Sequence, residues 1–211
     1  MLYVITGGSG SGKSEYAEKL ATKLKGEHSL HYIATMYPYE DEETRVRIAR
    51  HRAQRSGRGF ETIEQPLRIR ELKDRTDMEN ALLECMSNLL ANEMYQEDGG
   101  IQALFKPVRD EKYNQYVYDV CDNLDTDRLV EQDNKDADDI IIKPVMELAG
   151  RLENLIIVTN EIFSDGNTYD IDTEEYVRLL GYINKRLCEM ADCVVEVVCG
   201  IPMAVKGEVP C

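Results

Sequence analysis

The residues best suited to chemistry form a glycine-rich stretch near the amino terminus. Residues 7–14 read GGSGSGKS and fit the phosphate-loop pattern G-x-x-x-x-G-K-[ST] at every fixed position. The glycines let backbone N–H groups turn toward a phosphate, Lys13 brings a cation to the β- and γ-phosphates, and Ser14 offers a hydroxyl to Mg²⁺. The stretch predicts a nucleoside triphosphate site made by Gly7, Gly8, Ser9, Gly10, Ser11, Gly12, Lys13 and Ser14.

The elements that such a loop needs are present on both of its sides. The apolar, β-prone run Leu2–Thr6 precedes it and is typical of a buried strand. A strand, a glycine turn and a helix in this order aim a helix amino terminus at an anion, so we interpret the stretch as a phosphate loop rather than a flexible linker. The residues that recur at helical spacing after the loop are Tyr16, Ala17, Leu20, Ala21 and Leu24.

Two carboxylates stand at the ends of further apolar runs. Glu84 follows residues 81–83, and Glu161 follows residues 158–160. A carboxylate at the end of a buried strand suits a phosphate-loop site, because it can hold Mg²⁺ or its water shell beside Ser14. We favour a metal or nucleotide contact for Glu84 over an ordinary charged strand end, and we rank Glu161 second.

One of the three histidines has unusual neighbours. His28 lies in a polar turn and His31 in a strand-like run, which favours structural roles for both. Arg47, His51 and Arg55 share one face of a predicted helix. The flanking guanidinium groups disfavour the charged imidazole, and the neutral ring is the nucleophilic form. A solvated basic face explains the same spacing, and from the spacing alone we favour that structural interpretation.

Apolar runs alternate with helix-like segments along the chain. This pattern implies a parallel sheet that is covered on both faces and binds ligands at the carboxyl ends of its strands. We therefore expect an α/β fold, namely a phosphate-loop NTPase-like, three-layer architecture with a mostly parallel central sheet. The expected strands are 2–6, 30–35, 60–64, 80–85, 155–159 and 193–199, and the expected helices follow residue 13 and cover 40–55 and 174–190.

We expect a single domain over residues 1–211 with an acidic insertion at about 95–144. That segment holds 13 Asp and Glu against 6 Lys and Arg, and the spacing of Tyr113, Tyr116 and Val117 predicts a surface helix. The net charge of −15 argues against a nucleic-acid partner. No run is long enough to span a membrane and no secretory signal is visible, so we expect a cytoplasmic protein whose six cysteines are reduced thiols.

Taken in order, these motifs resemble one family, the bifunctional adenosylcobinamide kinase/adenosylcobinamide-phosphate guanylyltransferases of cobalamin biosynthesis. The resemblance covers about residues 1–95 and 152–207, and its specificity comes from the order and spacing of the pieces. The pieces are TGGSGSGKS (6–14), YIAT (32–35), RIARH (47–51) with Arg52 and Arg55, ETIE (61–64), LLEC (82–85), VTNE (158–161), Gly181 with Asn184, Ala191 with Asp192, and GIP (200–202).

The resemblance implies roles for individual residues. His51 matches the guanylylated histidine of the family, so we predict that His51 is the nucleophile and that Lys13 is the other catalytic residue. Mg²⁺ would lie at Ser14 and Glu84. Nucleotide contacts are implied for the glycine-rich loop and for Ala34, Thr35, Met36, Arg52, Ala53, Gln54, Arg55, Glu64 and Glu84.

The implied chemistry has two stages. GTP or ATP phosphorylates adenosylcobinamide, and GMP then passes from GTP through a GMP–histidine intermediate to adenosylcobinamide phosphate, giving adenosylcobinamide-GDP. The partner is therefore a corrinoid, and the resemblance implies a homo-oligomer, specifically a trimer. Two alternatives stay open, a small-molecule kinase without transferase activity and a non-catalytic nucleotide-binding switch protein.

The chain departs from the family in three places. The family usually has Arg where Gly10 stands, and it usually has Pro and Trp where this chain has Ser56 and Phe60. We expect these changes to affect the fine geometry of the nucleotide. The segment between Tyr95 and Pro144 is longer and more acidic than the resemblance leads us to expect, which concerns the corrinoid entrance or an oligomer contact.

Overall fold

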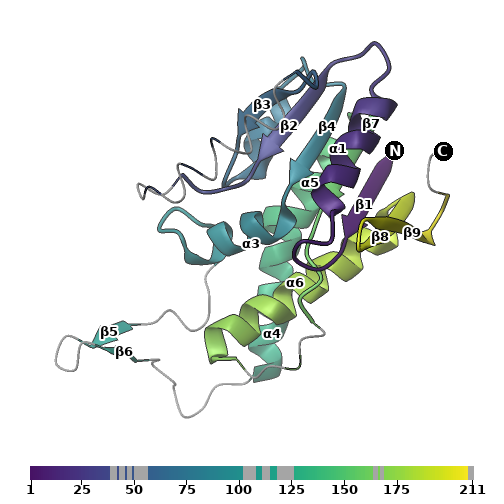
Figure 1. Ribbon diagram of the computed structural model, residues 1–211. Helices are drawn as coiled ribbons and strands as arrows, with labels where there is room; N and C mark the ends of the chain where they lie inside the picture. Colours follow the sequence, from purple (N-terminus) through teal and green to yellow (C-terminus); the bar gives the residue numbers. More distant parts are fainter. Residues whose placement is uncertain are drawn as a thin grey trace.

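A seven-stranded sheet organises the chain in a computed structural model that describes residues 1–38, 42, 46, 49, 57–101, 108–110, 115–117, 126–163, 166 and 169–208 (Figure 1). The first six strands in sheet order are parallel, and the last is antiparallel to its neighbour. In sheet order they are β3 (Glu61–Glu64), β2 (Leu30–Ala34), β4 (Asn80–Glu84), β7 (Asn154–Val158), β1 (Leu2–Thr6), β8 (Cys193–Val198) and β9 (Ile201–Lys206).

Helices cover both faces of the sheet. The helices are α1 (Lys13–Leu24), the 3₁₀ helix η1 (Ile69–Asp74), α3 (Met86–Tyr95), α4 (Thr126–Ala137), the π-helical turn η2 (Asp138–Ile142), α5 (Lys143–Ala149) and α6 (Ile171–Met190). α1 packs on one face, and η1, α3, η2, α5 and α6 contribute to the core on the other. The three layers confirm the predicted α/β fold class.

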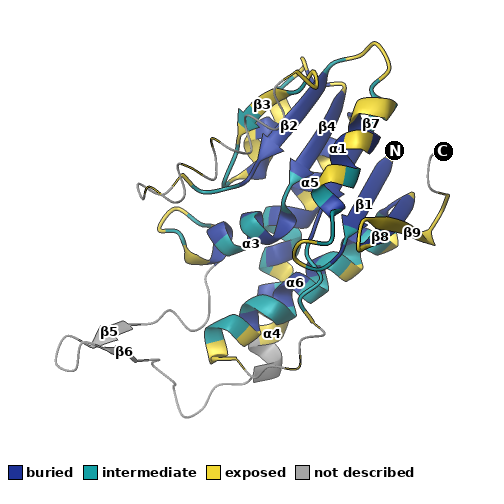
Figure 2. Cartoon of the chain, in the orientation of Figure 1, coloured by how far each residue is buried: buried dark blue, intermediate teal, exposed yellow. Residues whose placement is uncertain are grey.

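The strand sequences explain why both faces are covered. Along β1, Tyr3 and Ile5 join the core under α1, whereas Leu2 and Val4 join the core on the opposite face. All four side chains are buried, so the strand reads as a continuous apolar run instead of an alternating one. Figure 2 shows the central strands in dark blue between the helical layers.

α6 begins three residues earlier than the sequence predicts. Asp170 precedes the helix, and its carboxylate accepts a hydrogen bond of 2.9 Å from the backbone N–H of Thr173. This side-chain cap satisfies a donor that the helix cannot satisfy itself, so the first turn forms before the apolar periodicity starts at Val177.

The surface helix predicted around Tyr113, Tyr116 and Val117 is wrong where the structure describes it. There β6 (Gln115–Val117) pairs antiparallel with β5 (Val108–Asp110), and Val117 lies opposite Val108. Tyr and Val favour strands as much as they mark a helical face, so a short apolar run is ambiguous until its partner is known. Tyr113 itself lies outside the described residues.

The end of the predicted acidic insertion contributes to the main core. Ala137, Ile141, Ile142 and Val145 are at most 3% exposed and pack with the residues under α6. Core packing therefore resumes well before residue 144. Most of the helix predicted for residues 40–55 lies outside the described residues, apart from 42, 46 and 49. No helix within the described ranges is both long enough and apolar enough to cross a membrane.

Candidate functional site

The glycine-rich loop joins β1 to α1 at the carboxyl edge of the sheet. Gly12 has a φ of 89° and directly precedes α1, a conformation that glycine adopts without the strain of a side chain. A Cβ added to Gly7 would lie 2.5 Å from the carbonyl oxygen of Val197 and 2.6 Å from Ser11 Oγ. These two positions therefore require glycine, as the phosphate-loop interpretation predicts.

Neighbouring strand ends hold the loop in place. The backbone N–H of Glu161 donates to the carbonyl oxygen of Gly7 at 3.1 Å, and that of Gly200 donates to the carbonyl oxygen of Ser11 at 2.8 Å. Glu161 follows β7 and Gly200 follows β8, the two strands that flank β1. The loop is thus fixed from both sides at the start of α1.

Lys13 turns back over this loop. The residue is only 8% exposed, and its Nζ donates to the carbonyl oxygen of Gly8 at 3.0 Å. Burial lowers the pKa of Lys13, and the nearby Cys85 and Glu84 act in the opposite direction. The ammonium group is therefore held close to Glu84 at the place where phosphate oxygens would enter.

Glu84 ends β4, and aromatic residues orient its carboxylate. The hydroxyl of Tyr32 donates to Glu84 Oε2 at 3.0 Å. Phe60 meets the ring of Tyr32 edge-on, with 5.8 Å between the ring centroids. Phe60 thus makes an aromatic contact that restrains Tyr32 and, through it, Glu84.

A hydrogen-bonded corner joins the ends of β2 and β4. Thr35 is fully buried, and its hydroxyl donates to the carbonyl oxygen of Cys85 at 2.8 Å and accepts from the Cys85 N–H at 2.7 Å. The side-chain amide of Asn92, on α3, donates to the carbonyl oxygen of Thr35 at 2.8 Å. Residues 34–36 therefore lie at the same edge of the sheet as the loop, and their contact with a nucleotide stays a prediction.

Glu64 lies at this edge as well, but it is remote from the loop. It ends β3, which is four strands away from β1, whereas β4 with Glu84 is two strands away. At about 4.8 Å between neighbouring strands, these separations are roughly 19 Å and 10 Å. Counted in strand spacings, Glu64 is therefore twice as far from the loop as Glu84.

The predicted nucleophile His51 lies outside the described residues, together with Arg52, Ala53, Gln54 and Arg55. The described chain resumes at Gly57 in a turn that leads into β3. The role of His51 therefore stays a prediction.

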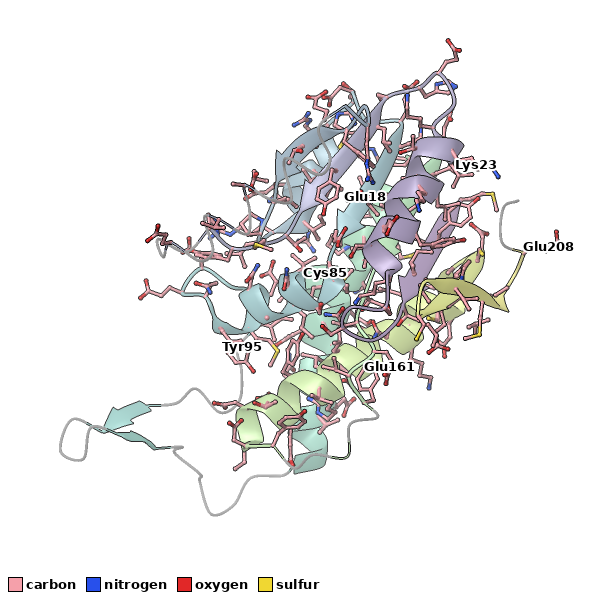
Figure 3. The ribbon with its side chains drawn as sticks, viewed as in Figure 1. Glu18, Lys23, Cys85, Tyr95, Glu161 and Glu208 are labelled. Carbon is pink, nitrogen blue, oxygen red and sulfur yellow. The ribbon has the colours of Figure 1, made fainter. Side chains whose placement is uncertain are left out.

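A cavity of about 410 Å³ opens beside the loop and contains two residues that the sequence analysis missed. The Arg58 guanidinium reaches it from the turn before β3 and forms an ion pair with Glu18 on α1, a residue labelled in Figure 3. The two residues are 40 positions apart in the sequence, so no local motif predicts their contact. The other residues that line the cavity are Gly10, Ser11, Gly12, Lys13, Ser14 and Glu15.

Amide side chains support the segment after β7. Asn184 on α6 accepts from the hydroxyl of Thr159 at 2.7 Å and donates to the carbonyl oxygen of Asn160 at 3.2 Å. Glu161 Oε1 accepts from the backbone N–H of Phe163 at 3.0 Å. These contacts give Asn184 and Glu161 a part in shaping the turn whose backbone also holds Gly7.

Comparisons with known proteins identify related chains. A family model described as cobinamide kinase / cobinamide phosphate guanyltransferase matches residues 3–205. The chain is 29% identical over 207 residues to the bifunctional adenosylcobalamin biosynthesis protein CobP of Pseudomonas aeruginosa, covering 97% of each chain.

Two solved structures are similar over most of this chain. The flagellar accessory protein FlaH from Methanocaldococcus jannaschii matches with a TM-score of 0.43 and 13% identity, over 98% of this chain and 78% of FlaH. The second structure is an ATPase domain, which matches with a TM-score of 0.42 and 9% identity, over 92% of this chain and 68% of that domain.

Proposed function

Because this chain belongs to the cobinamide kinase / cobinamide phosphate guanyltransferase family, it is a kinase and a nucleotidyltransferase, and we propose that both reactions use the glycine-rich loop and that GMP transfer passes through His51. The observation that carries the proposal is the loop itself, with Lys13 buried at its centre and Glu84 oriented beside it.

In the kinase reaction, the γ-phosphoryl group of GTP or ATP passes to the aminopropanol hydroxyl of adenosylcobinamide. The loop N–H groups and Lys13 hold the triphosphate and stabilise the charge that develops on its oxygens. Ser14 and Glu84 would hold Mg²⁺, because hydroxyl and carboxylate oxygens are the hard ligands that this ion prefers. When bound, the ion neutralises phosphate charge.

Residues 34–36, residues 52–55 and Glu64 complete the nucleotide contacts in this proposal. The hydrogen-bonded corner built by Thr35 lies two to three strands from the loop, a distance suited to the ribose and base rather than to the phosphates. Glu64 lies one strand farther out, which favours a contact at the far end of the nucleotide.

In the transferase reaction, an imidazole nitrogen of His51 attacks the α-phosphorus of GTP. A phosphorus–nitrogen bond forms, the bond to the bridging oxygen breaks, and pyrophosphate leaves with that electron pair. A phosphate oxygen of adenosylcobinamide phosphate then attacks the same phosphorus. The phosphorus–nitrogen bond breaks, His51 is regenerated, and adenosylcobinamide-GDP is released.

The connectivity of the chain supports His51 as the nucleophile. Arg58 lines the cavity beside the loop, and His51 precedes it by seven residues. At ~3.3–3.6 Å per residue, seven residues reach at most about 25 Å, so the imidazole is tethered within reach of the cavity. His28 and His31 lie at the opposite, amino edge of the sheet and have no such access.

Labelling with GTP tests the proposed intermediate. Wild-type protein incubated with α-labelled GTP should carry acid-labile, base-stable label, the signature of a phosphoramidate. His51→Ala should lose the label and retain measurable kinase activity, and His28→Ala, at an exposed histidine outside the site, should behave like the wild type. Absence of label in the wild type, or persistent label in His51→Ala, refutes the intermediate.

The labelling assay and an analysis of the reaction products together separate the alternatives. A kinase without transferase activity would phosphorylate adenosylcobinamide and carry no label. A nucleotide-binding switch protein would bind GTP and turn over no corrinoid. Product analysis with adenosylcobinamide and GTP therefore distinguishes all three functions.

We propose that the protein forms a homo-oligomer, and the sequence resemblance implies that this oligomer is a trimer. β9 supports this, because it is an edge strand and exposes Ile201 and Val205, at 65% and 64%. An exposed apolar edge strand offers unpaired backbone groups and apolar side chains to another chain. Light scattering of the purified protein measures the stoichiometry, and a monomer at micromolar concentration contradicts the proposal.

A further inference from the structure

A buried histidine faces two carboxylates at the amino edge of the sheet, on the side opposite the nucleotide loop. His31 lies on β2 and is directly opposite Glu61 on β3 in the strand register. Asp77 comes from the segment that leads from η1 into β4. The ligand atoms of the three side chains all lie within 4.8 Å of one another, and within the described part of the chain they form the one such group.

The environment of His31 is unusual for an imidazole. The residue is 1% exposed, and neither Nδ1 nor Nε2 has a hydrogen-bond partner among the described residues. A buried polar group without a partner destabilises the folded state. Nε2 is the ring nitrogen that faces the two carboxylates, so a cation held between the three groups would give Nε2 a partner.

The distances indicate which kind of cation fits. Nε2 lies 3.5 Å from Glu61 Oε2 and 3.7 Å from Asp77 Oδ2. A protonated imidazole would draw a carboxylate oxygen to about 2.7–2.9 Å. In contrast, ligand atoms on a tetrahedral Zn²⁺ with bonds of about 2.0–2.2 Å lie roughly 3.3–3.6 Å apart. These two distances are therefore too long for hydrogen bonds and close to those between ligands that share one metal ion, and the two carboxylate oxygens lie within 4.8 Å of each other.

The carboxylates are prepared for such a role. Arg75 Nε donates to Asp77 Oδ1 at 2.8 Å. Arg75 also bonds to Oδ2, so it orients the carboxylate and leaves a second lone pair on that oxygen for another ligand. Ligating carboxylates commonly have such supporting hydrogen bonds. Glu61 is 69% exposed in its side chain and can adjust.

We propose that His31, Glu61 and Asp77 form a binding site for a divalent transition metal ion, Zn²⁺ by ligand chemistry, with water in the fourth position. One imidazole and two carboxylates are a ligand set that Zn²⁺ accepts. Solvent reaches the site past the exposed Glu61 and Asp77, which supplies both the entry path and the water.

The site would connect three separate segments of the chain. It ties the start of β3 to β2 and to the residues before β4, at the point where the chain returns from the segment that carries His51. Its position at the amino edge keeps it away from the nucleotide. We therefore assign it a structural role that is independent of the proposed transfer reaction.

Metal binding without nucleotide tests this site. Chelator-treated wild-type protein should take up one equivalent of Zn²⁺ by calorimetry and should melt at a higher temperature when Zn²⁺ is present. Glu61→Gln changes a side chain that is 69% exposed, and it should weaken Zn²⁺ binding by at least about tenfold and abolish the shift in melting temperature. His31→Gln should do the same.

His28→Gln is the matched control. His28 also faces carboxylates, with Nδ1 3.0 Å from Glu79 Oε1, but it is exposed and hydrogen-bonded. This variant should bind Zn²⁺ like the wild type. The proposal is overturned if the wild type binds no Zn²⁺, or if Glu61→Gln and His31→Gln both bind it with the wild-type dissociation constant.

Discussion

Replacing Lys13 with methionine should separate what this lysine does for the nucleotide from what it does for folding. Methionine keeps the length of the apolar stem and removes the charge. Lys13 is 8% exposed, so an effective dielectric constant of ~20 suits its surroundings; at ~4 Å from a phosphate charge this gives about 4 kcal/mol. Since about 1.36 kcal/mol corresponds to a factor of ten, kcat/KM should fall by roughly 10³-fold.

The Lys13→Met substitution should reduce the stability of the folded protein much less than it reduces kcat/KM. Burial lowers the pKa of Lys13, which means that the folded state holds the charged form less favourably than the unfolded state does. Between the lowered folded pKa and the ordinary value near 10.4, the unfolded state binds more protons, so wild-type stability gains from rising pH in that window. The variant has no ammonium at this position and should lack that contribution.

Two measurements check this reasoning, with Lys19→Met as the control. Lys19 lies on the same helix, 68% exposed in its side chain and paired with Glu15, so its loss should leave kcat/KM near the wild-type value. Kinase and guanylyl-transfer rates are measured for all three proteins, and urea unfolding is followed from about pH 7 to about pH 10. A loss below tenfold in both reactions, or a Lys13→Met protein much less stable than the wild type at neutral pH, would refute the argument.

Three further substitutions test individual contacts. Gly7→Ala places a Cβ 2.5 Å from the carbonyl oxygen of Val197 and should reduce nucleotide affinity at least about tenfold, measured by calorimetry. Tyr32→Phe removes the 3.0 Å bond to Glu84 and should lower kcat about tenfold while the melting temperature changes little. Arg58→Ala should raise KM for GTP by roughly three- to tenfold, because Arg58 lines the cavity beside the loop. The effect should be modest because the Arg58 side chain is partly exposed, and an unchanged KM excludes contact with the nucleotide.

The glycine-rich loop could be predicted because its chemistry is contiguous in sequence. Eight consecutive residues carry the glycines, the lysine and the serine, and the flanking strand and helix follow without interruption. The carboxylate Glu84 could be located by the same logic, because a parallel sheet brings every strand's carboxyl end to one edge.

Contacts between distant segments could not be predicted in this way. The ion pair of Arg58 with Glu18 and the bond from Tyr32 to Glu84 join residues 40 and 52 positions apart. Each depends on how a turn enters the sheet, which no local pattern encodes. The strand at Gln115–Val117 was missed for a related reason, since its partner at residues 108–110 decides between strand and helix.

The amino edge of the sheet shows this limit most sharply. His31 reads in sequence as an ordinary strand residue, and only the register of β2 against β3 brings it opposite Glu61. Successive strand residues point to opposite faces, so a shift of one residue would turn His31 toward α1 and away from Asp77. The same parallel alignment that gathers the nucleotide residues at one edge therefore also assembles, at the other, a group of ligands that no sequence motif announces.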